Sequence, residues 1–131
     1  MASIFTKIIN GEIPCYKVAE SDNFFAFLDI FPLKKGHTLV VPKKEIDYIF
    51  DIDDNMLKDY IAFAKKVALA IEKTIQCKRV GISVIGLEVP HAHIHLIPLD
   101  EIGDMNFSNP KIKFSDQEFQ EIANDIAENF K

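Results

Sequence analysis

The chain has 131 residues, 48% of them hydrophobic, and a formal net charge of -5. This length supports one compact core and leaves little material for a second, so we expect a single domain over residues 1–131. An acidic chain with one arginine is a poor candidate for binding long nucleic acid, which requires a basic face. The two cysteines form no C-x-x-C pair, and no apolar run reaches the roughly 20 residues of a membrane helix. We therefore expect a cytoplasmic protein that has neither a disulfide framework nor a membrane segment.

The first half of the chain predicts three strands. Two β-prone runs, 15–19 and 24–28, flank the turn-forming residues 20–23 and are expected to form a hairpin. After a loop over residues 31–36, the β-branched run 37–41 predicts a third strand, which Pro42 closes.

The second half predicts two helices and two further strands. From Asp53 to about Ile75, apolar residues recur every three or four positions, and Asp53 or Asp54 can serve as N-cap. The residues expected on the buried face of this helix are Leu57, Ile61, Ala64, Ala68, Ile71 and Ile75. Residues 79–85 and 89–99 predict strands around a tight connection at Gly86, and the capping-box spacing of Ser115 and Glu118 predicts a helix from residue 115 onward. Together these elements predict an α+β fold with a five-stranded antiparallel sheet.

Three of the four histidines, His91, His93 and His95, alternate within the last predicted strand. Because side chains of a strand point to alternate faces, the three imidazoles are expected on one face, about 6.6 Å from one to the next. The apolar residues between them face the core. The histidine face must then meet water, a ligand or other polar groups.

Three interpretations of this motif compete. The first is a row of hydrogen-bonded surface histidines, and the second is a metal site. Three histidines on a straight strand span about 13 Å, too far to converge on one ion at ~2.0 Å, although two could bind it with an outside carboxylate. The third, which we favour, is nucleophilic catalysis. A neutral imidazole, with a pKa near 6.5, can attack phosphorus while its neighbours stabilise charge and protonate the leaving group.

The motif His-x-His-x-His followed by apolar residues, at positions 91–97, resembles the signature of the histidine triad (HIT) family. Residues 3–8, 11–14, 26–30 and 36–43 also resemble the N-terminal half of that family, in its Hint-like bacterial-type branch. The resemblance covers nearly the whole chain up to Leu99. It implies a HIT-like fold with one long central helix and a C-terminal helix. It also implies hydrolysis or transfer at the α-phosphorus of a purine nucleoside monophosphate derivative, such as a nucleoside phosphoramidate.

The resemblance assigns a role to each histidine. His93, the central residue of the motif, would attack the α-phosphate and form a nucleotidyl-histidine intermediate, which water then hydrolyses. His95 would contact the phosphate or protonate the leaving group. His91 and His37 would orient the nucleophile and fix its tautomer, although the sequence alone would place His37 at the start of a strand, facing solvent.

The same resemblance assigns nucleotide-binding residues. Asp29 matches the acid that accepts hydrogen bonds from the ribose hydroxyls; its alternative role is to initiate the turn that follows. Ile4, Phe5, Phe27 and Ile30 match positions that line the base pocket by apolar contact and stacking. Without the resemblance these four would be interpreted as core residues.

Two departures from the family pattern bear on chemistry. Many relatives have a Gly-Gln-Ser/Thr stretch before the triad, whereas this chain has Leu87 and Glu88 in place of the Gln and the Ser/Thr, and leucine donates no hydrogen bond. Backbone N–H groups near Glu88 and Val89 are candidates to replace the missing donors. A Glu88 carboxylate inside the site would favour a cationic amine over a polyphosphate leaving group, but we favour a solvated glutamate. Ser3 and Thr6 occupy the places of zinc-binding cysteines in some bacterial relatives, so we expect no metal and no other cofactor.

The expected ligand is therefore a small purine nucleotide, and the expected assembly is a homodimer, because relatives form two-fold dimers. Two other functions stay open: a dinucleoside polyphosphate hydrolase, and a non-catalytic nucleotide-binding module. Residues 100–114 suggest no chemistry.

Overall fold

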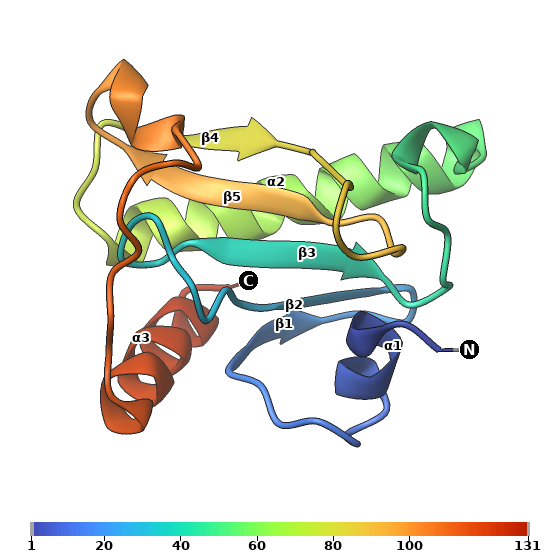
Figure 1. Cartoon of the computed structure of the whole chain (residues 1–131), viewed down its shortest axis with the longest axis horizontal. Coiled ribbons are helices and arrows are strands. Elements are labelled where there is room, and N and C mark those ends of the chain that lie inside the picture. Colours follow the sequence, from blue (N-terminus) through green and yellow to red (C-terminus); the bar gives the residue numbers. More distant parts are fainter. Residues whose placement is uncertain (1, 131) are drawn as a thin grey trace.

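A five-stranded antiparallel sheet forms the centre of the computed structural model, which describes residues 2–130 (Figure 1). The strand order is β1-β2-β3-β5-β4. The strands are β1 (Lys17–Glu20), β2 (Phe24–Leu28), β3 (Thr38–Pro42), β4 (Arg79–Ser83) and β5 (Ile94–Leu99). The helices are α1 (Ile4–Ile9), α2 (Asp54–Thr74) and α3 (Asp116–Glu128), with the 3-10 turns η1 (Ile49–Asp51) and η2 (Ile102–Met105). The predicted α+β fold is confirmed.

Two of the helices, α2 and α3, cover one face of the sheet, with α2 behind β5 and β3 and α3 near β1 and β2 (Figure 1). The side chain of Asp53 accepts a hydrogen bond from the Met56 N–H and caps α2, and the predicted capping box of α3 is present. The prediction that Ile61 is buried is wrong, since its side chain is 44% exposed. The buried residues of α2 are Tyr60, Phe63, Ala64, Val67, Ala70 and Ile71. Compared with the predicted buried face, the observed one is rotated about the helix axis so that it includes Tyr60 and Phe63.

The other face of the sheet carries a smaller apolar cluster of Phe5, Phe25, Phe27, Leu39 and Val41. Phe5 comes from α1, a helix that the sequence did not predict. A helix of six residues is too short to display a 3.6-residue period, and its clearest signal is the N-cap, where Ser3 accepts from the Thr6 N–H. The arrangement leaves room on this face for a cavity.

The last two strands are shorter than predicted. The strand predicted over 89–99 begins at Ile94, and the one predicted over 79–85 ends at Ser83, so residues 84–93 form a long connection in place of a tight turn at Gly86. Pro90 has no N–H to offer a neighbouring strand. The His91 N–H donates to the Val89 carbonyl, and the next N–H, from Ala92, donates to the carbonyl of Ile46 instead of to the sheet.

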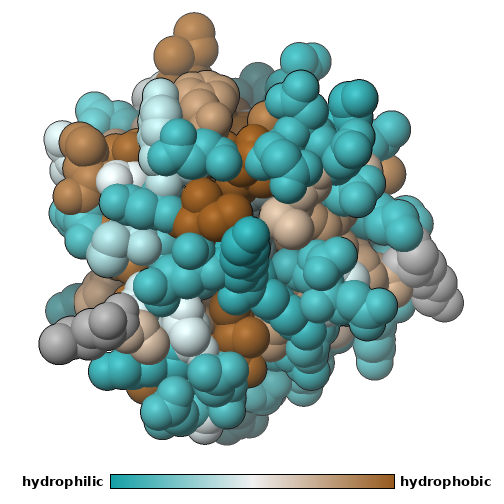
Figure 2. Space-filling view, turned by 90° about the vertical axis from the view of Figure 1, so that its right-hand side faces the viewer, coloured by the Kyte–Doolittle hydropathy of each residue, from teal (hydrophilic) through white to brown (hydrophobic). Residues whose placement is uncertain are grey.

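The first and third strands differ from prediction by one or two residues. The first begins at Lys17 instead of residue 15 and includes Glu20, and the third begins at Thr38 and includes Pro42. Within residues 2–130, no helix has the length and apolar content to span a bilayer. The face at the right of Figure 1 is mostly hydrophilic, with apolar patches between the polar residues (Figure 2).

Candidate active site

A cavity of about 490 Å³ lies on the face of the sheet that α1 partly covers, a volume suited to a small ligand. Residues of α1, the β2–β3 connection, the segment before β5 and the segment after η2 contribute to it. The lining residues are Ile4, Phe5, Ile8, Ile13, Pro14, Cys15, Phe27, Leu28, Asp29, Ile30, Phe31, His37, Leu39, Glu88, Val89, His93, His95, Phe107 and Lys111.

Every residue predicted to bind nucleotide lies on this cavity: Ile4, Phe5, Phe27, Asp29, Ile30, Glu88 and Val89. Of the predicted catalytic histidines, His37, His93 and His95 line it and His91 does not. Phe107 and Lys111 were missed, because their segment follows the strand with no periodic pattern to place it against the histidines.

The three histidines of the motif lie next to one another, although only His95 belongs to β5. The ring centroids of His93 and His95 are 5.0 Å apart, and the Phe5 ring packs edge-on against both His91 and His93. All three side chains are buried. The segment before the strand thus keeps the histidines together, and the alternating apolar residues Ala92 and Ile94 reach the core as predicted.

The backbone sets the tautomer of His93. Its Nδ1 lies 2.8 Å from the backbone carbonyl oxygen of His91. A carbonyl can only accept, so Nδ1 carries the proton and donates it. In the neutral ring, Nε2 then has the lone pair.

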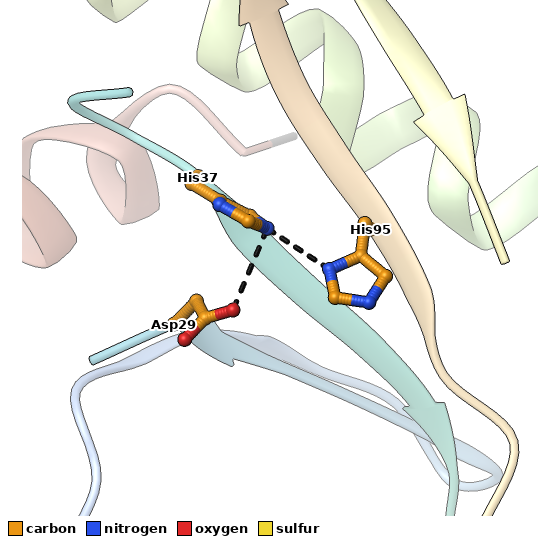
Figure 3. Close-up of side chains that lie close together, drawn as sticks. All are labelled: Asp29, His37 and His95. Atoms are coloured by element: carbon orange, nitrogen blue, oxygen red, sulfur yellow. Dashed lines mark hydrogen bonds and ion pairs between the residues drawn. The ribbon is translucent and has the colours of Figure 1, made fainter. Parts of the chain in front are cut away.

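His37 and His95 form a second hydrogen-bonded unit, drawn in Figure 3. The Leu33 N–H donates to His37 Nδ1 at 3.0 Å, so the proton of the neutral His37 ring lies on Nε2. His37 Nε2–H donates to His95 Nδ1 at 3.0 Å, so the His95 proton lies on Nε2, across the ring. His95 therefore carries an N–H at the ring position where His93 carries a lone pair.

Burial keeps this pair neutral at physiological pH. Desolvation, with a smaller contribution from the Lys111 charge, lowers the pKa of His37 from 6.5 to about 4. Desolvation is also the main cause that lowers the pKa of His95 to about 4, and the nearby Asp29 carboxylate opposes it. The prediction that His37 would face solvent, had the sequence stood alone, is wrong because the residue is buried.

Asp29 has two contacts, and one of them matches its alternative predicted role of initiating the turn. Its Oδ1 accepts from the Phe31 N–H at 2.8 Å, which forms the turn, and its Oδ2 lies 3.5 Å from His37 Nε2 (Figure 3). The remaining lone pairs of the carboxylate can accept further hydrogen bonds at the cavity wall.

Asp29, His37 and His95 also bring three possible metal-ligand atoms within 4.8 Å of one another. A metal-bound histidine donates its other ring N–H to an acceptor. His37 Nδ1 faces a donor instead, the Leu33 N–H, so its proton lies on the very atom that would bind the ion. This donor set does not fit a metal, and the hydrogen bonds account for the cluster.

Hydrogen bonds to the N-cap residue of α1 and to the last residue of β3 hold the His91 ring in place. Its Nε2–H donates to the Pro42 carbonyl at 2.7 Å, and its Nδ1 accepts from the Ser3 hydroxyl at 2.7 Å. Glu45 Oε1 accepts from the Ser3 N–H at 2.6 Å and from the Thr6 hydroxyl at 2.7 Å. These donors lower the pKa of the Glu45 carboxyl to about 2. Ser3 and Thr6, which occupy the places of the zinc-binding cysteines of some bacterial relatives, thus form with Glu45 a hydrogen-bonded anchor for His91.

Residues 87–89, in the connection before the triad, have no side-chain amide or hydroxyl. Leu87 is 87% exposed, whereas Glu88 and Val89 lie on the cavity wall. Glu88 is exposed to solvent, as we expected from the sequence, and it also borders the cavity.

A buried pair of imidazoles with opposite tautomers, beside an apolar cavity with a carboxylate at its rim, defines a candidate phosphoryl-group site. The HIT domain family model matches residues 10–102, and the chain belongs to this family. An uncharacterized HIT-like protein of Borreliella burgdorferi is 36% identical over 96% of both chains. Adenosine 5'-monophosphoramidase hnt1 of Schizosaccharomyces pombe is 34% identical over 100% of both chains. The crystal structure of a Hit-like protein from Bartonella henselae superposes with a TM-score of 0.83 at 32% identity, covering 97% of this chain and 95% of the other.

Proposed function

We propose that this protein is a histidine triad hydrolase that acts at the α-phosphorus of a purine nucleoside monophosphate derivative, such as a nucleoside phosphoramidate. The observation that carries the proposal is the pair of tautomers on one cavity wall. His93 presents a lone pair at Nε2 while His95 carries an N–H at its own Nε2. The similarity to an adenosine 5'-monophosphoramidase over the whole chain supports the same reaction class.

The reaction proceeds in two displacements. His93 Nε2 attacks phosphorus, the bond from phosphorus to the leaving group breaks, and a covalent nucleotidyl-histidine forms. His95 Nε2–H is oriented to donate a hydrogen bond to the leaving atom, and the proton that this atom takes up comes from solvent. Water then attacks phosphorus and loses a proton to solvent, the bond from phosphorus to His93 Nε2 breaks, and the nucleoside monophosphate is released. His93 is free again.

The other cavity residues hold the nucleotide. Asp29 accepts hydrogen bonds from the ribose hydroxyls, and its turn contact with the Phe31 N–H fixes the carboxylate for this purpose. Ile4, Phe5, Phe27 and Ile30 provide apolar surface for a purine base. His91 positions the nucleophile through its backbone carbonyl, and His37 fixes the tautomer of His95.

Trapping the intermediate tests this mechanism. Wild type and His93→Ala are mixed with adenosine 5'-phosphoramidate, quenched in alkali to preserve a phosphorus–imidazole bond, and weighed by mass spectrometry. We expect one adenylyl group on wild type, lost in acid, and none on His93→Ala, with kcat/KM reduced at least about 10³-fold. A labelled His93→Ala variant would refute the assignment. Nucleotide binding by wild type with no turnover would identify the binding module instead.

A substrate comparison separates the two enzymatic functions. We expect wild type to prefer the phosphoramidate to a diadenosine polyphosphate, and the reverse preference would identify a polyphosphate hydrolase. Because Glu88 lines the cavity, Glu88→Gln should weaken this preference. An unchanged preference would place Glu88 outside the chemistry.

The proposed active form is a cytoplasmic homodimer in which residues 1–131 act as one HIT domain. β4 is the outer strand of the sheet, with hydrogen-bonding groups on one side left for another strand. Ile82 on β4 is 55% exposed, and Leu69 on α2 is 45% exposed. Sedimentation of wild type and Ile82→Lys tests this surface, with a monomeric variant as the expected result.

A further inference from the structure

One proton in the cavity, the Nε2–H of His37, faces two acceptors (Figure 3). His37 Nε2 lies 3.0 Å from His95 Nδ1 and 3.5 Å from Asp29 Oδ2. His37 has no second proton to donate, because its Nδ1 accepts from the Leu33 N–H. Burial, with a smaller contribution from the Lys111 charge, lowers the pKa of His37 to about 4, so the ring takes up no further proton at neutral pH. The two acceptors therefore compete for a single donor.

The structure shows the arrangement in which His95 receives this hydrogen bond. The contact to His95 Nδ1 is the shorter of the two, so the proton of the neutral His95 ring lies on Nε2. The proposed mechanism requires a donor at that atom. The acceptor that His37 serves thus decides whether His95 can act on the leaving atom.

The same three side chains permit a second arrangement. One ring nitrogen of each histidine and one oxygen of Asp29 lie within 4.8 Å of one another, and the Asp29 side chain is partly exposed. A shift of this side chain would let the carboxylate accept from both rings, in charge-assisted hydrogen bonds. His95 would then carry its proton on Nδ1, after losing one from Nε2 to solvent and gaining one at Nδ1 from solvent, with no change in net charge. Its Nε2 would have a lone pair and could not donate to the leaving atom.

The ligands of the Asp29 carboxylate choose between these arrangements. A carboxylate has about four lone-pair sites, and one of them is occupied by the Phe31 N–H. In the proposed complex the ribose hydroxyls donate to this carboxylate as well, which leaves less capacity for the two imidazoles. Ribose binding therefore favours the arrangement in which His37 donates to His95.

We propose that Asp29 is a positioning residue that couples recognition of the ribose hydroxyls to the position of the proton on His95. The enzyme then selects for these hydroxyls in the chemical step as well as in binding. The inference rests on the proposed function, since it takes the ribose contact and the role of His95 from it. It differs from a simple binding contact, whose loss would raise KM and leave kcat unchanged.

Paired substrates separate the two effects. KM and kcat, the latter measured as the single-turnover rate at saturation, are determined for adenosine 5'-phosphoramidate and for its 2',3'-dideoxy analogue. For wild type we expect the dideoxy analogue to have a higher KM and a kcat lower by about tenfold, the effect of redirecting one hydrogen bond that involves a charged group. An equal kcat for the two substrates overturns the proposal.

Two substitutions at the cluster separate coupling from binding. In Asp29→Asn the amide oxygen can keep the turn contact with the Phe31 N–H, but the NH2 group cannot accept from a histidine, so kcat should be the same for both substrates. In His37→Gln the amide has two protons, one for each acceptor, so the kcat difference should shrink while the KM difference persists. Asp22 is exposed and does not line the cavity, and Asp22→Asn as matched control should retain both differences. A kcat difference of wild-type size in Asp29→Asn overturns the proposal.

Nitrogen NMR of the histidine rings tests the coupling without turnover or substitution. Ring-nitrogen chemical shifts distinguish a protonated nitrogen from one with a lone pair, and wild type is compared in complex with adenosine monophosphate and with its 2',3'-dideoxy analogue. We expect the His95 proton on Nε2 in the first complex and a shift of population toward Nδ1 in the second. The same tautomer in both complexes overturns the proposal, whatever the kinetics. This comparison also decides the matter if a variant fails to fold in thermal unfolding.

The two arms distinguish failure of the coupling from failure of the proposed function. If the tautomers differ but wild type hydrolyses neither phosphoramidate, the proposed hydrolysis fails and the coupling stands. If wild type hydrolyses both with equal kcat, the coupling fails and the proposed function stands.

Discussion

The neutral His37–His95 pair makes the fold sensitive to acid, and the size of the effect follows from the two pKa values. Both rings have a pKa of about 4 in the folded chain and 6.5 when unfolded. The unfolded chain binds protons more tightly, so acidification favours unfolding. The full stability is present above pH 6.5 and is lost progressively as the pH falls to about 4. Between pH 7 and pH 5, each ring should cost about 2 kcal/mol of unfolding free energy.

Urea unfolding of wild type and His37→Gln at pH 8, 7 and 5 measures this cost. Glutamine can still donate to His95 Nδ1 but does not titrate. We expect the change in unfolding free energy between pH 7 and 5 to be smaller in the variant by about 2 kcal/mol. The interval from pH 8 to 7 serves as control, because both rings stay neutral there. Carboxylates titrate in both proteins, so their contributions to the change in unfolding free energy cancel when the two proteins are compared. An equal loss in both proteins would show that His37 is not a buried neutral imidazole.

Two further substitutions test the surroundings of the site. Ser3→Ala removes the hydroxyl that donates to His91 Nδ1, so we expect a loss of about 1–3 kcal/mol in urea unfolding, with kcat reduced more than KM. Unchanged stability and kcat would show that the anchor is dispensable. Gly36→Ala should lower Tm by more than Gly11→Ala, because both glycines have positive φ, but only at Gly36 would the new Cβ lie 2.8 Å from Ile75 Cγ1. Equal shifts in the two calorimetric melts would show that this side chain yields without cost.

The sequence predicted the elements with strong periodicity. The helix after Asp53 and the capping box at Ser115 are both present, because spacing and capping are local properties. The prediction failed for Ile61, because several apolar residues of this helix allowed two choices of buried face. It also failed for the first residue of β5. There the alternation of residues persists through irregular backbone, so a period of two does not by itself mark a strand.

The site was predicted unevenly for a related reason. The motif and the family resemblance led to the residues that the structure brings to one cavity, including His37, which is distant in sequence from the triad. They did not lead to Phe107 or Lys111, since contact between the segment after η2 and the histidines depends on tertiary packing that no local pattern encodes.

The positions of the protons were also beyond the sequence, and the backbone decides them. A carbonyl faces His93 Nδ1, whereas an N–H faces His37 Nδ1, so chemically identical side chains receive opposite roles. Side-chain substitutions around the cavity cannot readily reverse these roles, because the partners are main-chain groups. The tautomer of His93, which the proposed mechanism requires, is therefore set independently of the side chain at position 87.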